Sequence, residues 1–378
     1  MEITPEERFG LTINGRIVRT PIAIASMAGT VDAAYVLERA GNVGAAFIGG
    51  YSIDGPSLEA SRMMAAEGRE EFLFEDPVQE IGHQLDLLSG SDIVAGVNIR
   101  ASSPEAYGDI AKTYGRAAVY EIDAHCRQLP MIQAGCGEYL LTDPMKLIRC
   151  VKALKAEDVT VSVKMRAGVS QDDAALCRRL WMAGADMIHV DLMDLGYAKL
   201  RQIRNSCPAI LIANNGLYTF DRVKDMFSHG ADLVSVARRS DERTLAGLDA
   251  AISRYADEHG WYNSPKQLCR GGDIRALAFC CMPVKRCPLI PTLGQVGMSR
   301  EEYINLKQNA VVGTPLHDGK NTCFGSLTWC CKDSSPCMFR GMAISQLGLT
   351  DREYMREKRI LSQKIMRRIF HEVPVDSR

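Results

Sequence analysis

The chain has 378 residues, a formal net charge of −1, and 46% hydrophobic against 24% charged residues, which is the composition of a globular protein. Its length suits one large domain with a smaller one, or two ordinary domains. A near-zero net charge does not favour a protein that binds mainly nucleic-acid phosphates, although a local basic patch is compatible with it. No apolar run reaches the ~20 residues that span a bilayer, and residues 1–10 show no signal pattern. We therefore expect a cytoplasmic protein with no membrane partner.

The first expected element is a β-hairpin around Asn14-Gly15, because this dipeptide between two alternating segments is a strong turn signal. Short apolar runs bounded by Gly, Asn or Pro follow, with amphipathic stretches such as 143–156 and 172–183 between them. Eight such strands with helical crossovers predict an α/β fold, a (β/α)8 TIM barrel whose bottom the hairpin closes; an open doubly wound sheet is the alternative. The expected strands are residues 21–27, 45–51, 92–99, 118–124, 160–167, 187–192, 209–215 and 233–238.

The pattern changes after residue 258, where a polar, irregular stretch precedes a group of cysteines. We predict two domains, a barrel over residues 1–258 and a cysteine-rich domain over residues 259–378. The second is expected to end in a helix over residues 351–370, which carries seven Lys or Arg and three Asp or Glu. Such a basic helix can contact RNA or form a solvated face.

The thirteen cysteines are unevenly placed, five over residues 126–207 and eight between residues 269 and 337. In a cytoplasmic protein they are not expected to form disulfides, and eight thiolates divide into two sites of four ligands. The C-x2-C pair typical of structural zinc is missing, and the adjacent cysteines favour two [4Fe–4S] clusters, with zinc and metal-free thiols as the alternatives. The predicted ligands are Cys269, Cys280, Cys281, Cys287, Cys323, Cys330, Cys331 and Cys337.

Polar side chains gather where the expected barrel strands end, which is where barrel enzymes keep their active residues. Lys164 and Arg166 end the fifth strand, and His189 and Asp191 lie on the sixth. A lone Lys or His in a barrel strand is often just paired with a carboxylate, so the prediction depends on their number and common placement. A glycine after the seventh strand and an arginine after the eighth suit a phosphate group.

Several of these segments resemble the tRNA-dihydrouridine synthase family over about residues 11–245. Residues 25–32 (ASMAGTVD) resemble its A-P-M-A-G-V-T-D, and residues 121–126 (EIDAHC) resemble its D-I-N-x-G-C-P. Residues 161–166 (VSVKMR) resemble V-T-V-K-x-R, and Asn215-Gly216 resembles N-G-D. Each motif is short, and their order and spacing together make the resemblance specific.

The resemblance implies FMN as cofactor. It implies that Cys126 delivers a proton to the substrate, and that Lys164 faces the N1–C2 side of the flavin, where a cation stabilises the reduced form. His189 would lie near the ribityl-phosphate chain. The full set of implied cofactor-binding residues is Ser26, Met27, Ala28, Asn98, Lys164, His189, Asn215, Gly216, Ala237 and Arg238.

The chain departs from the family motif around Cys126: Asp123 stands in place of Asn, His125 in place of Gly, and Arg127 in place of Pro. Leu217 likewise replaces the Asp of N-G-D. A flavin-binding fold tolerates such changes more easily than substrate specificity does. A histidine next to Cys126 could also lower the pKa of the thiol.

The cysteine-rich region resembles the methanogenesis marker protein 9 domain, whose hallmark is a repeated aromatic-C-C-x4-P-C. Residues 329–337 (WCCKDSSPC) fit it throughout, and residues 279–287 fit except for Arg286 in place of Pro. Members of that family resemble a dihydrouridine-synthase-like barrel joined to the cysteine domain, as here. The resemblance implies an association with methanogenesis and an anaerobic cytoplasm.

Three functions are compatible with these features. The first is an FMN- and iron–sulfur-dependent oxidoreductase with a small-molecule or protein redox partner. The second is a tRNA-dihydrouridine synthase that reduces uridine, which would make tRNA a partner. The third is a non-enzymatic metal-binding scaffold or assembly factor. The residues alone do not predict the substrate, the electron donor or the oligomeric state.

Overall fold

The computed structural model describes residues 4–259, 293–294 and 296–313, with a few isolated positions after them (348, 361, 364–365 and 368–369). The chain divides into two compact units, residues 11–255 and residues 1–10 with 256–378. Most of the second unit lies outside the described residues, so the domain boundary at residue 258 stays a prediction. The helix expected over residues 351–370 also falls mainly outside them.

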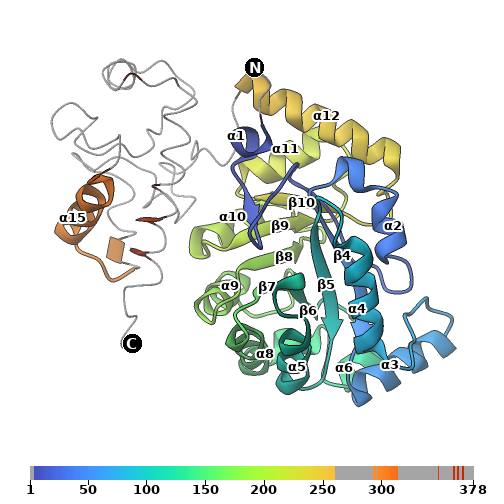
Figure 1. Ribbon diagram of the computed structural model, residues 1–378. Coiled ribbons are helices and arrows are strands. Elements are labelled where there is room, and N and C mark those ends of the chain that lie inside the picture. The colour runs from blue at the N-terminus through green and yellow to red at the C-terminus, as the bar shows by residue number, and fades with distance from the viewer. Residues whose placement is uncertain are drawn as a thin grey trace. The chain divides into compact units, whose positions relative to one another are not determined.

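Eight parallel strands close into a barrel in the order β10-β3-β4-β5-β6-β7-β8-β9 (Figure 1). The predicted (β/α)8 barrel is therefore confirmed, and the open doubly wound sheet is wrong. Every expected strand is present within a few residues of its predicted ends. The strands are β3 (Ile22–Ile24), β4 (Ala45–Ser52), β5 (Val94–Arg100), β6 (Val119–Ala124), β7 (Thr160–Arg166), β8 (Met187–Asp191), β9 (Ile210–Asn214) and β10 (Leu233–Val236).

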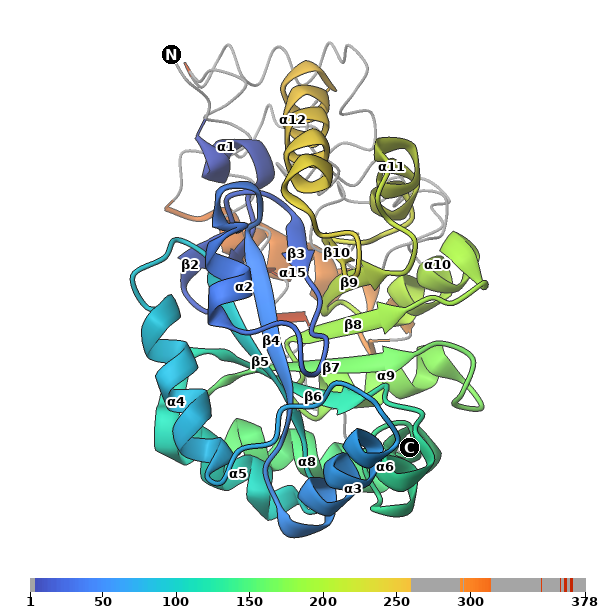
Figure 2. The same ribbon diagram turned by 90° about the vertical axis from the view of Figure 1, so that its right-hand side faces the viewer.

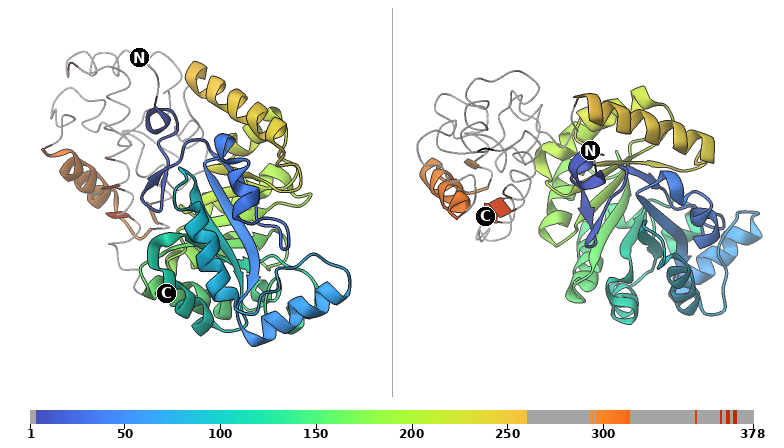
Figure 3. Two further views of the ribbon diagram at one scale, coloured as in Figure 1. Left: turned by 45° about the vertical axis from the view of Figure 1, so that its right-hand side comes forward. Right: turned by 45° about the horizontal axis from the view of Figure 1, so that its top comes forward.

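Helices surround the strands on the outside, as the views in Figures 2 and 3 show. They connect consecutive strands, and α5 packs beside α8. Two short 3-10 turns, Ala40–Asn42 and Gly115–Ala117, precede β4 and β6. The helices of this unit are α2 (Ala33–Leu37), α3 (Gly55–Ala66), α4 (Pro77–Leu88), α5 (Pro104–Tyr114), α6 (Leu129–Gln133), α7 (Tyr139–Thr142), α8 (Pro144–Ala156), α9 (Asp173–Met182), α10 (Gly196–Ser206), α11 (Phe220–Ser228) and α12 (Glu242–His259), the last of which runs past residue 255.

Capping residues in the sequence mark where several helices begin. The side chains of Asp54, Asp76, Ser103, Asp143 and Asp172 each accept a hydrogen bond from a backbone N–H in the first turn of the helix that follows. Four of the five helices also have Pro at N1 or N2, where its missing N–H costs nothing. These caps end the loops at the C-terminal face of the barrel at defined positions.

The predicted hairpin closes the opposite end of the barrel. Strands β1 (Thr12–Ile13) and β2 (Arg16–Ile17) pair antiparallel, with Asn14 and Gly15 both at positive φ. The buried side chains of Leu11, Ile13 and Val18 pack against the first residues of the barrel strands. The N-terminal end of the barrel is thus filled by side chains, and access from solvent is left to the other end.

The second unit contains α1 (Pro5–Phe9) and α15 (Arg300–Val311) among its described residues. Helix α15 was not predicted. It begins with a capping box in which Ser299 and Glu302 each accept from the other's backbone N–H, a pattern that the sequence already contained. No helix among the described residues combines the length and the apolar character that crossing a membrane requires.

Candidate active site

A cavity of about 1260 Å³ lies at the C-terminal ends of the barrel strands, and all eight strands or the loops after them contribute to its wall. Nine of the ten cofactor-binding residues implied by the family resemblance line it, as does Cys126. Residues spread over more than 200 positions of the chain are thus brought to one site. The nine are Ser26, Met27, Ala28, Asn98, Lys164, Asn215, Gly216, Ala237 and Arg238.

His189 is the residue that does not line the cavity. It lies wholly buried on β8, with Nδ1 2.8 Å from Glu121 Oε2 and Nε2 2.7 Å from Ser235 Oγ. A side chain enclosed in this way cannot contact a ligand in the cavity directly. Ser235 does line it. The expected position of His189 near a ribityl chain therefore stays a prediction, in which His189 would act on the ligand through Ser235.

A buried polar network joins six strands beneath the cavity. Besides His189, the carboxylate of Glu121 accepts hydrogen bonds from Asn98 Nδ2 at 2.8 Å and Ser162 Oγ at 3.0 Å, and Asn214 Nδ2 donates to Ser235 Oγ at 2.6 Å. Burial acts to raise the pKa of Glu121, but the contact with His189 and the charge of Lys164 lower it overall. Burial lowers the pKa of His189 more than Glu121 raises it.

These directions assign the protons of the network. An ionised Glu121 accepts from a neutral His189 that carries its proton on Nδ1, and Nε2 of His189 then accepts from the hydroxyl of Ser235. Beside this network, the buried Oδ1 of Asn98 has no hydrogen-bond partner in the described structure. A buried carbonyl oxygen without a donor is costly, and Asn98 lies in the cavity wall, where a ligand N–H can supply that donor.

Lys164 places a positive charge on the cavity wall. Its Nζ donates to the hydroxyl of Ser26 at 2.8 Å and to the carbonyl oxygen of Ser26 at 3.1 Å, and only 6% of the residue is exposed. Among the described residues it forms no ion pair. A buried ammonium held by neutral groups is poised to stabilise negative charge that a ligand brings into the cavity.

Cys126 sits on a loop that Asp123 organises. Asp123 Oδ1 accepts from the backbone N–H groups of His125 at 2.9 Å and Cys126 at 3.1 Å. Its Oδ2 accepts from Nε of Arg100 at 3.0 Å, and Arg100 also donates to Glu71 at 2.6 Å. Burial acts to raise the pKa of Asp123, but the Arg100 guanidinium keeps it below its ordinary value.

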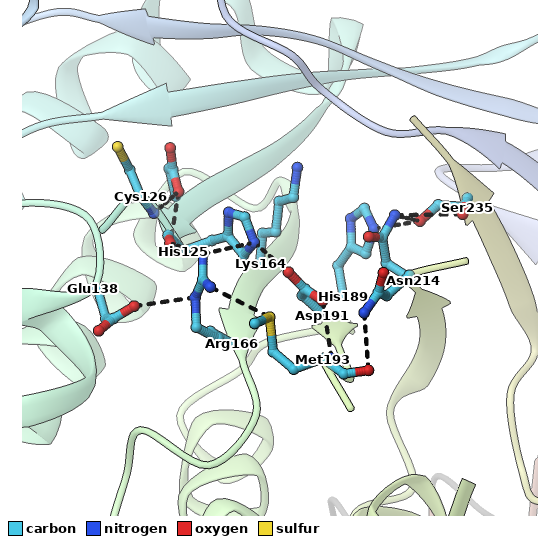
Figure 4. A network of polar contacts seen from close by, with 12 residues as sticks. His125, Cys126, Glu138, Lys164, Arg166, His189, Asp191, Met193, Asn214 and Ser235 are labelled. Carbon is cyan, nitrogen blue, oxygen red and sulfur yellow. Dashed lines mark hydrogen bonds and ion pairs between the residues drawn. The ribbon is translucent and has the colours of Figure 1, made fainter. Parts of the chain in front are cut away.

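The surroundings of Cys126 favour the protonated thiol over the thiolate. Burial raises the pKa of Cys126, and the opposing charge of Arg100 does not cancel this effect. The expectation that His125 lowers the thiol pKa is therefore wrong. The ring of His125 contacts Asp191 instead, with Nε2 2.7 Å from Asp191 Oδ2. Figure 4 shows His125, Arg166 and Asp191 facing one another.

The loops after β9 and β10 form the most cationic part of the wall. Asn215 and Gly216 both have positive φ, and Nδ2 of Asn215 donates to the carbonyl oxygen of Met193 at 2.8 Å. The exposed side chains that line the cavity here are Arg222, Arg238 and Arg239. Consecutive backbone N–H groups in such a turn, with arginines around them, are suited to an anion.

Two residues near Cys126 were missed from the sequence. Arg100 lies one position beyond the expected end of its strand, at Ile99, although the side chain two residues after Asn98 had to point to the same side of β5. Glu71 lies in the loop between α3 and α4, and no local pattern marks it. Only the closed barrel shows that these two side chains meet.

The eight predicted metal-binding cysteines, from Cys269 to Cys337, lie outside the described residues. Within the described part of the chain, no group of three or more His, Cys, Asp or Glu residues is arranged to hold a metal ion. The five cysteines of the barrel are buried. The metal sites therefore stay a prediction from the sequence.

Comparison with known proteins gives three findings. Residues 94–245 match the family model for dihydrouridine synthase (Dus). Over 108 residues the chain is 46% identical to the uncharacterized protein MJ0115 of Methanocaldococcus jannaschii, a stretch that covers 29% of this chain and 70% of that protein. It is 26% identical over 231 residues to the uncharacterized protein MJ0144 of the same organism, which covers 57% of this chain and 88% of that protein.

A solved structure shares the fold. DHODH from Eimeria tenella, in complex with ferulenol, superposes with a TM-score of 0.50 at 14% sequence identity, over 70% of this chain and 88% of that one. This likeness concerns the barrel architecture. The chain therefore belongs to the family of MJ0115, and residues 94–245 of its barrel are similar to dihydrouridine synthase.

Proposed function

We propose that this protein is an FMN-dependent oxidoreductase whose reaction takes place in the cavity at the C-terminal end of the barrel, beside Cys126. The observation that carries the proposal is the Lys164 ammonium, which is buried in the cavity wall, has only neutral hydrogen-bond partners and forms no ion pair among the described residues. A flavin oxidoreductase needs a cation where negative charge accumulates on reduction.

The residues present fit FMN in three independent respects. The orphaned Oδ1 of Asn98 offers an acceptor for a ring N–H. The turn at Asn215-Gly216 and the arginines around it offer donors and positive charge for a phosphate. The cavity volume of about 1260 Å³ exceeds the usual range for a single small-molecule site, which leaves space for a substrate beside the cofactor.

FMN, when bound, supplies hydride transfer to or from the substrate. The chain's own residues would bind and orient the cofactor and supply the proton. Lys164 and Asn98 would orient and polarise the ring, and Arg238 with the backbone at Gly216 would hold the phosphate. Cys126 would hold the proton that accompanies the hydride, because its raised pKa keeps the thiol protonated at neutral pH.

A second candidate is a tRNA-dihydrouridine synthase, and the match of residues 94–245 to that family favours it. The loop around Cys126 argues for a different substrate. Asp123 and His125 replace the Asn and Gly of the family motif, and both take part in polar contacts, with Arg100 and Asp191 respectively. Changes that alter the charge beside the reacting thiol are expected to alter the substrate rather than the cofactor.

We further propose that the cysteines of residues 259–378 hold two [4Fe–4S] clusters that exchange electrons with the flavin. The repeated aromatic-C-C-x4-P-C pattern supports this, and so does the spacing of the eight cysteines. The relatives MJ0115 and MJ0144 both come from Methanocaldococcus jannaschii, in agreement with the association with methanogenesis that the pattern implies. Zinc is the alternative occupant.

The test is an anaerobic purification of the full chain, followed by its visible spectrum and by assays of flavin, iron, sulfide and zinc on one sample. Bound flavin with stoichiometric iron and sulfide is the expected result. Zinc in place of iron would overturn the clusters and would move the RNA-modifying candidate to the front. A protein that neither contains nor takes up FMN would overturn the flavin assignment.

A variant pair tests the role of Lys164. K164M is expected to make the flavin midpoint potential more negative by about 30 mV or more, since about 1.4 kcal/mol of lost charge stabilisation corresponds to that shift for a two-electron couple. K155M is the matched control, because Lys155 pairs with Asp186 outside the cavity wall. Equal potentials in K164M and the wild type would contradict the assigned role.

A further inference from the structure

His125 occupies a position where the resembling family motif has glycine, so a titratable side chain stands where that motif has none. It directly follows β6 and lines the cavity, with 27% of its side chain exposed. Its backbone N–H is fixed by Asp123, which places the ring at a defined height above the strand ends. The functions assigned above to Lys164 and Cys126 leave this imidazole unused.

The ring of His125 is held by a carboxylate on a different strand. Nε2 lies 2.7 Å from Oδ2 of Asp191, the last residue of β8, and the other carboxylate oxygen of Asp191 accepts from the backbone N–H of Met193 at 3.1 Å. Burial acts to raise the pKa of Asp191, but the hydrogen bond from His125 lowers it overall. An ionised Asp191 needs a donor, so it selects the imidazole form with the proton on Nε2.

That choice leaves Nδ1 of His125 as an unprotonated nitrogen. It points away from Asp191 (Figure 4) and has no hydrogen-bond partner among the described residues. The arrangement is a base oriented by a carboxylate, with its reactive nitrogen on the open side of the ring. It is the same division of roles by which a carboxylate fixes the tautomer and orientation of a catalytic histidine.

The other charged groups around the ring do not cancel this arrangement. Arg166 from β7 lies 3.5 Å from Nε2 of His125, and its guanidinium also lies 3.1 Å from Glu138. Asp123 contacts the His125 backbone and is itself paired with Arg100. Asp191 is thus the carboxylate in direct contact with the ring, and the nearby arginine is itself paired with Glu138.

We propose that His125, oriented by Asp191, is a second proton-transfer group of the cavity, and that the substrate presents to it an ionisable O–H or N–H or an activated C–H. In that step the bond from the substrate hydrogen breaks, its electron pair stays on the substrate, and the proton binds Nδ1. The imidazolium then returns the proton to solvent or to the product. The inference rests on the proposed function only in taking this cavity as the place where substrate reacts.

The step can be measured without knowing the substrate, by using nitroethane as a small carbon acid. The wild-type protein in deuterated buffer is expected to exchange the α-hydrogens of nitroethane faster than buffer alone, followed by proton NMR. The exchange removes a proton and returns a deuteron, so no oxidant or reductant is involved. H125Q is expected to lower the protein-dependent rate about tenfold or more.

Two variants control for structure and for the other proton carrier. H83Q removes an exposed histidine of α4 outside the cavity wall and is expected to exchange like the wild type. C126S separates the thiol from the imidazole. Loss of exchange in C126S with retention in H125Q would identify the thiolate as the base and overturn the proposal, as would a wild-type rate equal to that of buffer. Far-UV circular dichroism confirms that each variant is folded.

Asp191 is a positioning residue in this scheme, and its test needs a spectroscopic signature. In protein labelled with ¹⁵N-histidine, long-range ¹H–¹⁵N spectra are expected to show His125 with its proton on Nε2, the signal being assigned by its loss in H125Q. D191N is expected to mix the two tautomers and to slow exchange less than H125Q does. An unchanged tautomer in D191N would overturn the role of Asp191.

The outcomes separate this inference from the proposed function. Normal exchange in a protein that binds no flavin would overturn the flavin assignment and leave the base in place. Flavin binding without exchange would overturn the role of His125 as a base and leave the flavin assignment in place.

Discussion

At the scale of single residues, the wall beside Cys126 depends on one guanidinium. The side chain of Arg100 is 5% exposed, and those of its partners Glu71 and Asp123 are 0% and 7% exposed. Two buried carboxylates share this cation, although Glu71 also has a longer contact of 3.9 Å with Arg69. Through Asp123 the cluster also holds the backbone of Cys126. Removing the cation therefore affects both the stability of the fold and the position of the thiol.

R100Q is expected to lower the free energy of unfolding by about 3 to 5 kcal/mol, because it removes the arginine partner of buried Asp123 and the closer of the two arginines at buried Glu71. Urea unfolding followed by circular dichroism measures the loss. The matched control is R116Q, which breaks the pair of Arg116 with Asp158, two side chains that are 68% and 83% exposed. That change is expected to cost about 0 to 1 kcal/mol. Equal losses in the two variants would contradict the buried role of Arg100.

At the scale of elements, the segment from the end of β6 to α7 forms the wall around Cys126 through close backbone packing. Gly137 has a φ of +59°, and a Cβ added to it would lie 2.3 Å from the carbonyl oxygen of Cys126. That oxygen already accepts from the backbone N–H of Glu138 at 2.8 Å. The turn before α7 thus touches the loop that carries the thiol, and only glycine leaves room for it.

G137A is expected to destabilise the barrel by about 1 to 3 kcal/mol through backbone strain and displacement, and to change the rate at which iodoacetamide alkylates Cys126. The control is G15A, at a φ of +74° with no atom near the added Cβ. In G15A the added Cβ raises the energy of a residue at positive φ, but it clashes with no other atom. Urea unfolding and peptide mass spectrometry give the two readouts, and a G137A variant that matches G15A in both would refute the packing argument.

The network around Glu121 is also an element-scale feature, since it connects side chains from six strands. An imidazole in the unfolded chain takes up a proton near pH 6.5, whereas the pKa of the folded His189 is lowered by burial. The unfolded state therefore binds more protons as the pH falls below about 6.5, and the free energy of unfolding decreases until the folded pKa is reached.

Replacing His189 is expected to remove this dependence. Between about pH 5 and pH 6.5 the wild-type unfolding free energy should fall more steeply than that of H189Q, by up to about 1.4 kcal/mol per pH unit for one proton. H83Q serves as control, because His83 is exposed on α4, and it should keep the wild-type slope. Parallel curves for the wild type and H189Q would show that His189 is protonated in the fold.

At the scale of the whole molecule, the net charge is close to zero, but positively charged side chains gather at the cavity. The chain as a whole carries −1, yet the residues that line the cavity include eight Lys or Arg and three Asp or Glu. The barrel brings these cations together from loops far apart in the sequence. A cavity of one sign attracts ligands of the other and loses that attraction as salt screens it.

The affinity of flavin-free protein for FMN is expected to fall roughly three- to tenfold as ionic strength rises from about 0.05 M to about 0.5 M. Quenching of FMN fluorescence measures it. Riboflavin, which has no phosphate, is the matched ligand control and should show a smaller dependence. If both flavins responded equally to salt, the arginines near Gly216 would not be the phosphate site.

The elements of the barrel could be read from the chain because their signals are local. Each strand is a short apolar run, the hairpin has Asn14-Gly15 at its turn, and helices such as α8 start at an acidic cap with proline next to it. Helix α15 was not predicted, although the capping box of Ser299 and Glu302 at its start is present in the sequence.

The site was predicted in part, and the reason differs from residue to residue. Cys126 and Lys164 lie in motifs whose spacing the sequence shows, Asn98 lies near the end of an expected strand, and all three line the cavity. Arg100 was missed because the predicted strand ended one residue early. The pairing of His125 with Asp191 was not predicted, since 66 positions separate them and their contact depends on the register of β6, β7 and β8.

The sequence by itself determined the fold class, the order of the strands and the residue types at their ends, since periodicity, capping and turn preferences act over a few neighbouring residues. Only the tertiary structure decided which side chains are buried and paired: that Glu121 and His189 lie under the cavity, that Arg100 serves two acids, and that His125 turns toward Asp191. The pKa of a group and its partner depend on burial and on charges from other strands, and these are set when the barrel closes.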